Sequence, residues 1–346
     1  MPTAALQRAP ERRAQQRSRR IEALDALRGL AIALMIFVNN PGDLDAMPSQ
    51  FVHSDWHGFR IAELVFPLFL FSAGISLALS RRSGAARPML RRTGLLVLLG
   101  CVLVSVKYRH LAPSTGTLQL IAGASLLAWA ARRWLSRRAQ AVAAAVVLGS
   151  LWLGFTVTGW APQANLAALV DSHMIGAPSD LGLLGMVSAS TIVLAGGWVG
   201  DGVMAAPTAI ARAAYAARIG LTTTAAGLAL AMPVPVNKRI WTPSYVVVGT
   251  GLSCLVLAAF LWWCGRRLDN DGLRPLQTLG SNAIAVYVVT SLAATTVLAP
   301  LQGPVFGWLA ARLAPAGGAV TWASGMLLAG YVLCRVLERR RTFIRL

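Results

Sequence analysis

The chain has 346 residues, of which 56% are hydrophobic and only 13% are charged. A soluble domain of this length does not need so much apolar material for its core, so the composition predicts an integral membrane protein. The formal net charge of +19 would suit a nucleic-acid-binding protein. The Lys and Arg residues lie mostly in short clusters between apolar runs, however, which argues against nucleic acid as a partner.

The amino-terminal segment has features of a secretory signal peptide. Its first twenty residues contain six arginines and lead into the apolar run 29–38. No small-x-small cleavage site follows at Asn39-Asn40-Pro41, so this run is predicted to remain as the first transmembrane helix. Residues 1–20 are predicted to form a disordered basic tail in the cytoplasm, and residues 21–346 a single transmembrane domain.

Ten apolar stretches are long enough to cross about 30 Å of hydrocarbon as helices. In chain order they cover residues 23–39, 61–79, 90–106, 117–134, 139–159, 182–200, 213–232, 244–265, 278–298 and 319–337. Two regions deviate: the seventh stretch contains Arg218, and the segment 302–318, with Pro304 and Pro315, is expected to form an interfacial loop or short helix. The predicted fold class is all-α, a polytopic membrane protein of about ten transmembrane helices with both termini on one side.

The positions of the basic residues test this arrangement independently, because loops on opposite sides of a membrane differ in Lys and Arg content. The amino-terminal tail, one set of alternate loops and the tail after Cys334 contain 25 of the 32 basic residues. The other set of loops contains six, and Arg28 lies within the first stretch. This asymmetry predicts that both termini lie in the cytoplasm.

The cysteines do not suggest a metal centre or a disulfide framework. All four lie within or at the ends of apolar stretches, without the short spacings of a zinc site; they are Cys101, Cys254, Cys264 and Cys334. They are interpreted as buried free thiols, and no metal site is predicted.

Polar residues that hydropathy does not explain gather on the extracytoplasmic side of the predicted topology. They are Asn39, Asn40, Asp43, Asp45, His53, Trp56, His57 and Glu63 around the first loop, Asn237, Lys238, Arg239 and Trp241 before the eighth stretch, and Gln119 at the start of the fourth. Taken singly, the histidines could be solvated loop residues beside an interfacial Trp, and the charged residues could be snorkelling or paired. Taken together, they form a candidate acid–base site.

A second feature lies at the opposite, cytoplasmic end of the first stretch. Asp25 and Arg28 are three residues apart, which places their side chains next to each other on a helix. They could form an ion pair at the start of the helix. Alternatively, Arg28 could bind the phosphates of an anionic cofactor together with other cytoplasmic arginines.

Several motifs follow one another along the chain: Leu24–Leu30, Val38-Asn39, His53-x-x-Trp56-x-Gly58, Glu63–Phe71, Gly116-x-Leu118-Gln119, Asp180–Leu184, Pro235-Val236-Asn237-Lys238-x-x-Trp241-x-x-Ser244-Tyr245-Val246, Gly280–Tyr287 and Arg339–Ile344. In this order they resemble the heparan-alpha-glucosaminide N-acetyltransferase family, including its bacterial members. The resemblance spans residues 24 to 346. It implies a multispan protein of the bacterial inner membrane that transfers an acetyl group from cytoplasmic acetyl-CoA to an amino sugar or glycan on the far side.

The resemblance also implies roles for individual residues. His53 corresponds to the catalytic histidine, with Asn39 as its amide neighbour and Glu63 as the nearby acid. The cofactor-binding residues inferred are Arg28, Asn237, Lys238 and Asn282, and the substrate-binding residues are Asn40, Trp56, Gln119 and Trp241. The chain departs from the family pattern in two places: Glu63 replaces the usual Asp, and Leu120 replaces an Arg, which puts one acceptor or acetyl-CoA contact in doubt.

The chemistry of amine acetylation fits these assignments. A protonated amine attacks a thioester only after a base removes its proton, and the ordinary pKa of His suits that task near pH 7. His53 would be that base or a transient acetyl carrier, Glu63 would orient its imidazole, and Asn39, Asn40, Asn237 or Lys238 would donate to the oxyanion.

Two other functions were weighed. An amino-sugar transporter is the main alternative, but proton-coupled carriers usually place ionisable groups near the membrane midplane, and here the helix centres contain almost none. A catalytically silent scaffold would be favoured if CoA did not bind. The sequence leaves the acceptor open, and it leaves a homodimer open because small residues suited to helix contacts are frequent throughout.

Overall fold

The computed structural model describes residues 22–80, 85–110, 116–174, 176, 181–266 and 271–342. The described residues form helices and connecting loops, with no β-strand beyond one isolated bridge between Trp160 and Asn165. The all-α fold class is therefore confirmed. The predicted tail 1–20, Arg82, Asp180 of the motif Asp180–Leu184 and the last two residues of the motif Arg339–Ile344 lie outside the described residues.

Each predicted stretch lies in a helix or a helix pair. The first helix covers residues 22–39. The others are α2 (Ile61–Leu79), α3 (Ala86–Tyr108), α4 (Thr117–Trp134), α5 (Arg137–Thr158), α6 (Leu166–Met174), α7 (Leu183–Ala205), α8 (Ala209–Leu230), α9 (Pro243–Arg266), α10 (Arg274–Ser281), α11 (Ala283–Thr295) and α12 (Ala299–Arg339), with short 3-10 turns at Ser49–Phe51 and Asp271–Leu273. The short helix α6 has no counterpart among the ten predicted stretches.

Two helices near the carboxyl end are broken. The ninth predicted stretch forms α10 and α11, which meet at Asn282 with a bend of 71°. The segment 302–318 is helical almost throughout, as the first part of α12, and the helix kinks at Ala314, whose φ is 61°. The kink falls at Ala314 because the following residue, Pro315, disfavours the α conformation in the residue before it. Of the two predicted forms, an interfacial loop or a short helix, the structure has the helix, which begins at Ala299 and is separated from the rest of α12 by the kink.

The membrane class predicted from composition is confirmed. Six described helices are long and apolar enough to cross a membrane, or seven if the bent α10–α11 pair makes one span. This is fewer than ten, so the count of ten stays a prediction. The three cysteines of α9 and α12 are buried and Cys101 is half-buried, and all four are free thiols.

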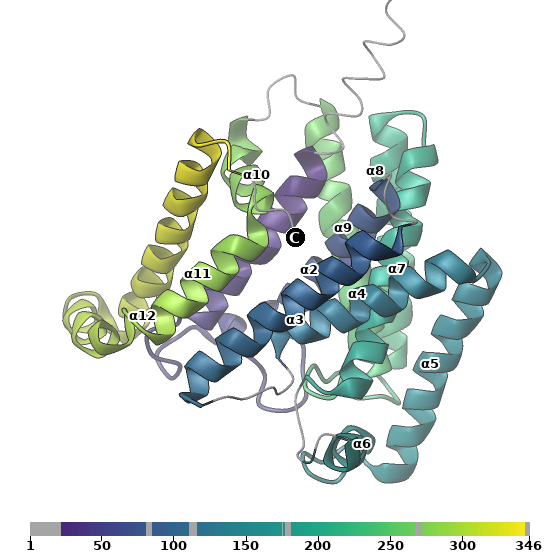
Figure 1. Ribbon diagram of the computed structural model, residues 1–346, viewed down its shortest axis with the longest axis horizontal. Helices are drawn as coiled ribbons and strands as arrows, with labels where there is room; N and C mark the ends of the chain where they lie inside the picture. Colours follow the sequence, from purple (N-terminus) through teal and green to yellow (C-terminus); the bar gives the residue numbers. More distant parts are fainter. Residues whose placement is uncertain are drawn as a thin grey trace, which may run out of the picture.

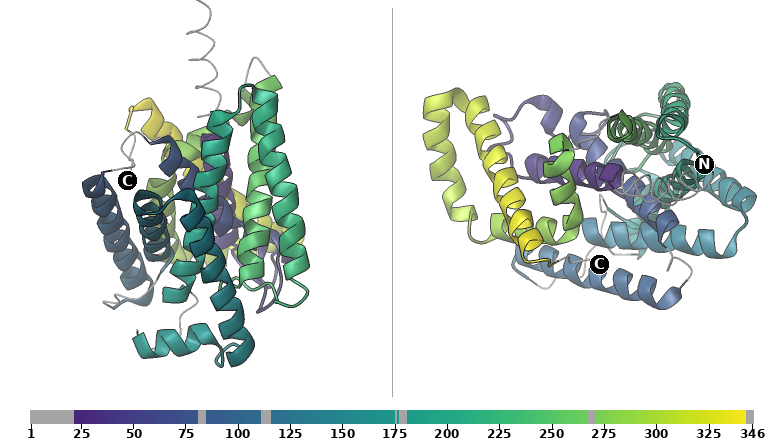
Figure 2. Two further views of the ribbon diagram at one scale, coloured as in Figure 1. Left: turned by 90° about the vertical axis from the view of Figure 1, so that its right-hand side faces the viewer. Right: turned by 90° about the horizontal axis from the view of Figure 1, so that it is seen from above.

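The first helix lies in the middle of the bundle, with α12 on one flank and α5 on the other (Figures 1 and 2). Five of its apolar side chains are completely buried, namely Ala23, Ala26, Leu27, Ala31 and Ile32, and Ile36 is only 2% exposed. Beside it α2 packs on α7 at very short range. A Cβ at Gly74 would collide with the carbonyl of Val193, and one at Gly196 with the carbonyl of Phe71, so glycine is what permits this approach.

The two ends of the bundle differ in chemistry. The loop after the first helix and the loop between α8 and α9 lie at its lower end in Figure 1, whereas the start of the first helix and the end of α12 lie at the upper end. At the turn between α4 and α5, Arg132 and Arg137 both bind Asp201 of α7, with N–O distances of 3.1 Å, so they join α4, α5 and α7. The predicted cytoplasmic basic clusters thus include contacts that stabilise the helices.

Cysteine labelling tests the predicted orientation. Among the positions proposed to face the cytoplasm, Arg82 lies outside the described residues, but Arg137 has a side chain that is 57% exposed. A cysteine at Arg137 is expected to resist a membrane-impermeant thiol reagent in sealed cells, whereas one at the exposed Asp55, beside His53, is expected to react. The unsubstituted chain gives the background. Rapid labelling of the Arg137 variant from outside would contradict the predicted topology.

Candidate active site

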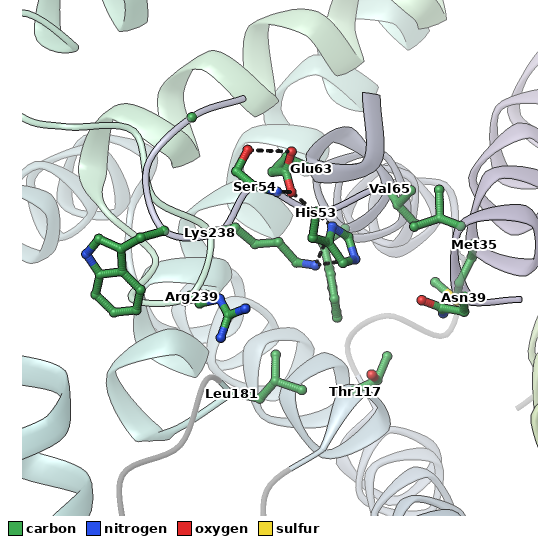
Figure 3. A pocket seen from close by; sticks show the side chains of 14 residues that line it. Met35, Asn39, His53, Ser54, Glu63, Val65, Thr117, Leu181, Lys238 and Arg239 are labelled. Atoms are coloured by element: carbon green, nitrogen blue, oxygen red, sulfur yellow. Dashed lines mark hydrogen bonds and ion pairs between the residues drawn. The ribbon is translucent and has the colours of Figure 1, made fainter. Parts of the chain in front are cut away.

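A cavity of about 210 Å³ opens at the lower end of the bundle, and we call it the His53 cavity. It is built by six segments: the end of the first helix, the loop before α2, the first turns of α2, the start of α4, the residues just before α7 and the loop before α9 (Figure 3). Its lining residues are Met35, Val38, Asn39, His53, Ser54, Trp56, Gly58, Glu63, Val65, Phe66, Thr117, Leu181, Lys238 and Arg239.

His53 and Glu63 form an ion-pair-like contact in this cavity. The imidazole Nδ1 lies 2.9 Å from Glu63 Oε1. The Glu63 side chain is 2% exposed, whereas His53 is 36% exposed towards the cavity. A buried carboxylate can only accept from a ring N–H, so it selects the tautomer with the proton on Nδ1 and leaves Nε2 as the basic nitrogen. This is the arrangement of base and orienting acid found in catalytic triads.

Glu63 is held in place by backbone and side-chain donors besides His53. Its Oε1 accepts from the Ser54 backbone N–H at 3.1 Å, and its Oε2 accepts from the Arg60 backbone N–H at 2.8 Å and from Ser54 Oγ at 3.3 Å. Glu63 is the third residue of α2, and it accepts from the backbone N–H of Arg60, the residue that precedes the helix, as in a capping box. The same carboxylate therefore begins α2, shapes the 53–60 loop and orients His53.

Lys238 approaches His53 from the other side. Its Nζ lies 2.9 Å from His53 Nε2 and 3.2 Å from Nδ1, and 5.3 Å from the centre of the Phe66 ring. The sequence analysis assigned Lys238 to the cofactor, but it lies against the predicted base. Arg239 also lines the cavity, so two cationic side chains face the wall formed by Asn39 (Figure 3).

Asn237 organises the loop that presents Lys238 and does not line the cavity. It is completely buried. Its Oδ1 accepts from the backbone N–H groups of Arg239 and Ile240 at 2.8 and 3.2 Å, and its Nδ2 lies 3.3 Å from Nδ1 of His57. A backbone bond from Gly58 N–H to the Val236 carbonyl, 2.8 Å long, ties the two loops together. The placement favours a role in positioning the loop over the predicted contact with cofactor.

The predicted substrate-binding residues are divided between the cavity and the core. Trp56 lines the cavity and donates from Nε1 to the Trp160 carbonyl at 2.6 Å. Asn40 donates to the Ile36 carbonyl, one turn earlier in the chain, at 2.7 Å.

The other two lie in contacts between helices. Gln119 packs between α3 and α4, where its Nε2 lies 3.8 Å from Cys101 Sγ. Trp241 is 1% exposed and packs edge-on against Phe66 and Tyr245. Only Trp56 of these four lines the cavity.

Arg28 and Asn282 lie together at the opposite end of the bundle. Arg28 binds Asp25 at 3.0 Å, as the three-residue spacing predicted, and also donates to Ser76 Oγ at 3.1 Å and the Gly280 carbonyl at 3.4 Å. Asn282 is completely buried at the break between α10 and α11. Both therefore belong to the end that carries the basic clusters, away from the His53 cavity.

Sequence reasoning gave no role to two contributors to the site. Ser54 gives Glu63 two of its donors, and Tyr245 of α9 donates from its hydroxyl to the Glu63 carbonyl at 2.9 Å. Ser54 directly follows the predicted base, so adjacency was the available signal. Tyr245 is 182 residues away from Glu63, and only the fold brings it close.

Comparison with known proteins finds similarity over the amino-terminal part of the chain. Residues 20–172 match the family described as heparan-alpha-glucosaminide N-acetyltransferase, catalytic. Two curated relatives named heparan-alpha-glucosaminide N-acetyltransferase, from Mus musculus and Homo sapiens, are 37% and 35% identical to this chain over 98 residues. The aligned part is 26% of this chain and 14% of each relative. His53, Glu63, Asn39 and Trp56 lie within the range matched by the family, whereas Lys238 and Arg239 lie beyond it.

Proposed function

We propose that this chain is a membrane acetyltransferase of the bacterial inner membrane and a member of the heparan-alpha-glucosaminide N-acetyltransferase family, whose model matches residues 20–172. In this proposal an acetyl group moves from cytoplasmic acetyl-CoA to the amine of an amino sugar or glycan on the periplasmic side. The observation that carries the proposal is the His53–Glu63 contact of 2.9 Å in a cavity open to one end of the bundle.

The proposed reaction begins with the acceptor amine. Nε2 of His53 removes a proton from the ammonium form, and the free amine attacks the thioester carbonyl of the donor. Glu63 stabilises the resulting imidazolium, because a buried carboxylate at hydrogen-bond distance favours the charged ring. The carbon–sulfur bond then breaks, the proton on His53 passes to the CoA thiolate, and the second proton of the original ammonium passes from the new amide nitrogen to water. In the alternative route His53 accepts the acetyl group first and passes it to the amine.

Oxyanion stabilisation is proposed for groups on both walls of the cavity. Lys238 Nζ is a cation within 3 Å of the base, and the Asn39 amide lies on the opposite wall (Figure 3). A donor fixed near the developing charge is typically worth about 10²–10³ in rate. Asn237 and Asn40 are left out of this role, because their amides already bind within the protein.

The donor is proposed to enter from the end that carries Arg28 and Asn282. Its phosphates need cations, and the pantetheine arm is long enough to cover much of the bilayer and bring the thioester towards His53. The cavity volume of about 210 Å³ is below the 300–1,000 Å³ typical of drug-sized ligands, so it suits a single amino group with its sugar ring.

Proteoliposomes with labelled acetyl-CoA on one side and unlabelled amino sugars on the other test both the reaction and its route. The expected result is labelled N-acetyl sugar on the acceptor side, formed at a rate that rises in proportion to the amount of protein. Product that forms only when donor and acceptor share one side would contradict the route. Movement of unmodified amino sugar across the membrane, without acetylation, would instead favour the transporter.

A further inference from the structure

The side-chain amine of Lys238 lies at the distance from His53 that an acceptor amine needs. A proton donor must lie about 2.6–3.2 Å from the general base. Lys238 Nζ lies 2.9 Å from Nε2 of His53, the ring nitrogen that Glu63 leaves available, and 3.2 Å from Nδ1. Lys238 is half-buried, and the backbone around it is fixed by the Asn237 amide and by the Gly58–Val236 bond. A primary amine is therefore held beside the base even when no acceptor is bound.

We propose that Lys238 is a site of self-acetylation, which the bound donor causes when no acceptor is present. This inference rests on the proposed acetyltransferase activity. His53 Nε2 takes a proton from the Lys238 ammonium, and Nζ attacks the carbonyl of the acetyl thioester. The new bond is Nζ–C, the bond that breaks is C–S, the proton on His53 passes to the departing CoA thiolate, and the second proton that Nζ loses passes to water. The products are Nζ-acetyl-Lys238, CoA and one proton.

Acetyl-Lys238 would be a dead end and not an intermediate. The product is an amide, which does not pass its acetyl group to another amine as a thioester or acyl-imidazole does. It also removes the cation beside His53 and adds a neutral group to a cavity of about 210 Å³. A lysine amine has an ordinary pKa of about 10.4, against about 7.7–8.0 for an α-amino group, so self-acetylation should be slower than transfer to an acceptor with a less basic amine. Donor without acceptor would then slowly inactivate the protein.

The sequence supplies a matched control, because Lys107 and Lys238 are its only lysines. Lys107 is exposed in the last turn of α3, so chemical acetylation by the donor should favour it over the half-buried Lys238. The experiment incubates the full-length protein with acetyl-CoA alone and follows both lysines by peptide mass spectrometry. Lys238 is expected to be acetylated at least about 10²-fold faster than Lys107, which is the low end of the usual gain from general-base catalysis. An added acceptor amine should suppress the labelling of Lys238.

Two variants separate the proposed reaction from chemical modification. In His53→Ala the labelling of Lys238 is expected to fall to the rate of Lys107, and in Lys238→Arg total incorporation should fall to the Lys107 background. Equal labelling of the two lysines, or unchanged labelling of Lys238 in His53→Ala, would overturn the inference. Transfer to an added amine without any labelling of Lys238 would overturn it while leaving the proposed function intact. Failure of both reactions would contradict both.

Discussion

Replacement of His53 by alanine is expected to lower acetyl transfer by about 10²–10⁴-fold, and by more if the imidazole also carries the acetyl group. The physical reason is that Nε2 is the basic nitrogen at the cavity, while Nδ1 is held by Glu63 at 2.9 Å. The variant should still fold and bind CoA, because the His53 side chain that is removed is 36% exposed and Glu63 keeps its three other donors. The measurement is the transfer rate from labelled acetyl-CoA, with CoA binding measured in parallel.

His57 is the matched control for this variant. It lies four residues away in the same loop, does not line the His53 cavity, and contacts only the Asn237 amide among the hydrogen bonds described. His57→Ala should therefore retain most activity, with any loss caused by a looser loop around Lys238. Near wild-type turnover by His53→Ala, or a larger loss in His57→Ala, would contradict the assignment of the base and the motif match beneath it.

The helices could be predicted from the sequence because their signal is local. Long apolar runs place a helix at every predicted stretch, from the first helix to α12. What the sequence does not determine is how helices break. The bend of 71° between α10 and α11 lies at the buried Asn282. The part of α12 before Ala314 continues through Pro304, although proline usually breaks or kinks a helix.

In the candidate site, too, a contact within one segment could be predicted from the sequence, whereas a contact between distant segments could not. His53 and Glu63 are ten residues apart in one loop-and-helix segment, so their proximity followed from the motif itself. The Lys238–His53 contact joins residues 185 positions apart, and no pattern within either segment indicates it. For that reason Lys238 was assigned to the cofactor, whereas it lies beside the base. The catalytic roles of all these residues remain predictions, since geometry shows proximity and not rate.

The polar residues assigned to the substrate show why residue type alone is a weak guide. Trp241 and Gln119 belong to motifs of the family, and both are buried in contacts between helices. Indole and amide side chains are used as readily for packing and capping as for binding, so a sequence cannot tell these uses apart. Burial and hydrogen-bond partners, which depend on the fold, make the distinction.

Glu63→Ala is expected to impair both folding and catalysis. The substitution leaves the backbone N–H groups of Ser54 and Arg60 without their acceptor in a site where Glu63 is 1% exposed. Each unsatisfied buried donor costs about 1–3 kcal/mol, so the loss of acceptor for these two donors should lower the free energy of unfolding by about 2–6 kcal/mol. Thermal unfolding in detergent measures this loss. A wild-type melting temperature would show that water or another group replaces the carboxylate.

Glu63→Gln separates the charge of this residue from its hydrogen bonds. The amide is isosteric and keeps one acceptor oxygen, so the unfolding temperature should lie much nearer to wild type than that of Glu63→Ala. It cannot stabilise a His53 imidazolium as a carboxylate does, and its NH₂ group competes with the Nδ1 proton that sets the tautomer. Transfer should therefore fall to a rate between wild type and His53→Ala. If Glu63→Gln were as fast as wild type, Glu63 would act only as the structural start of α2, and the base would need another orienting group.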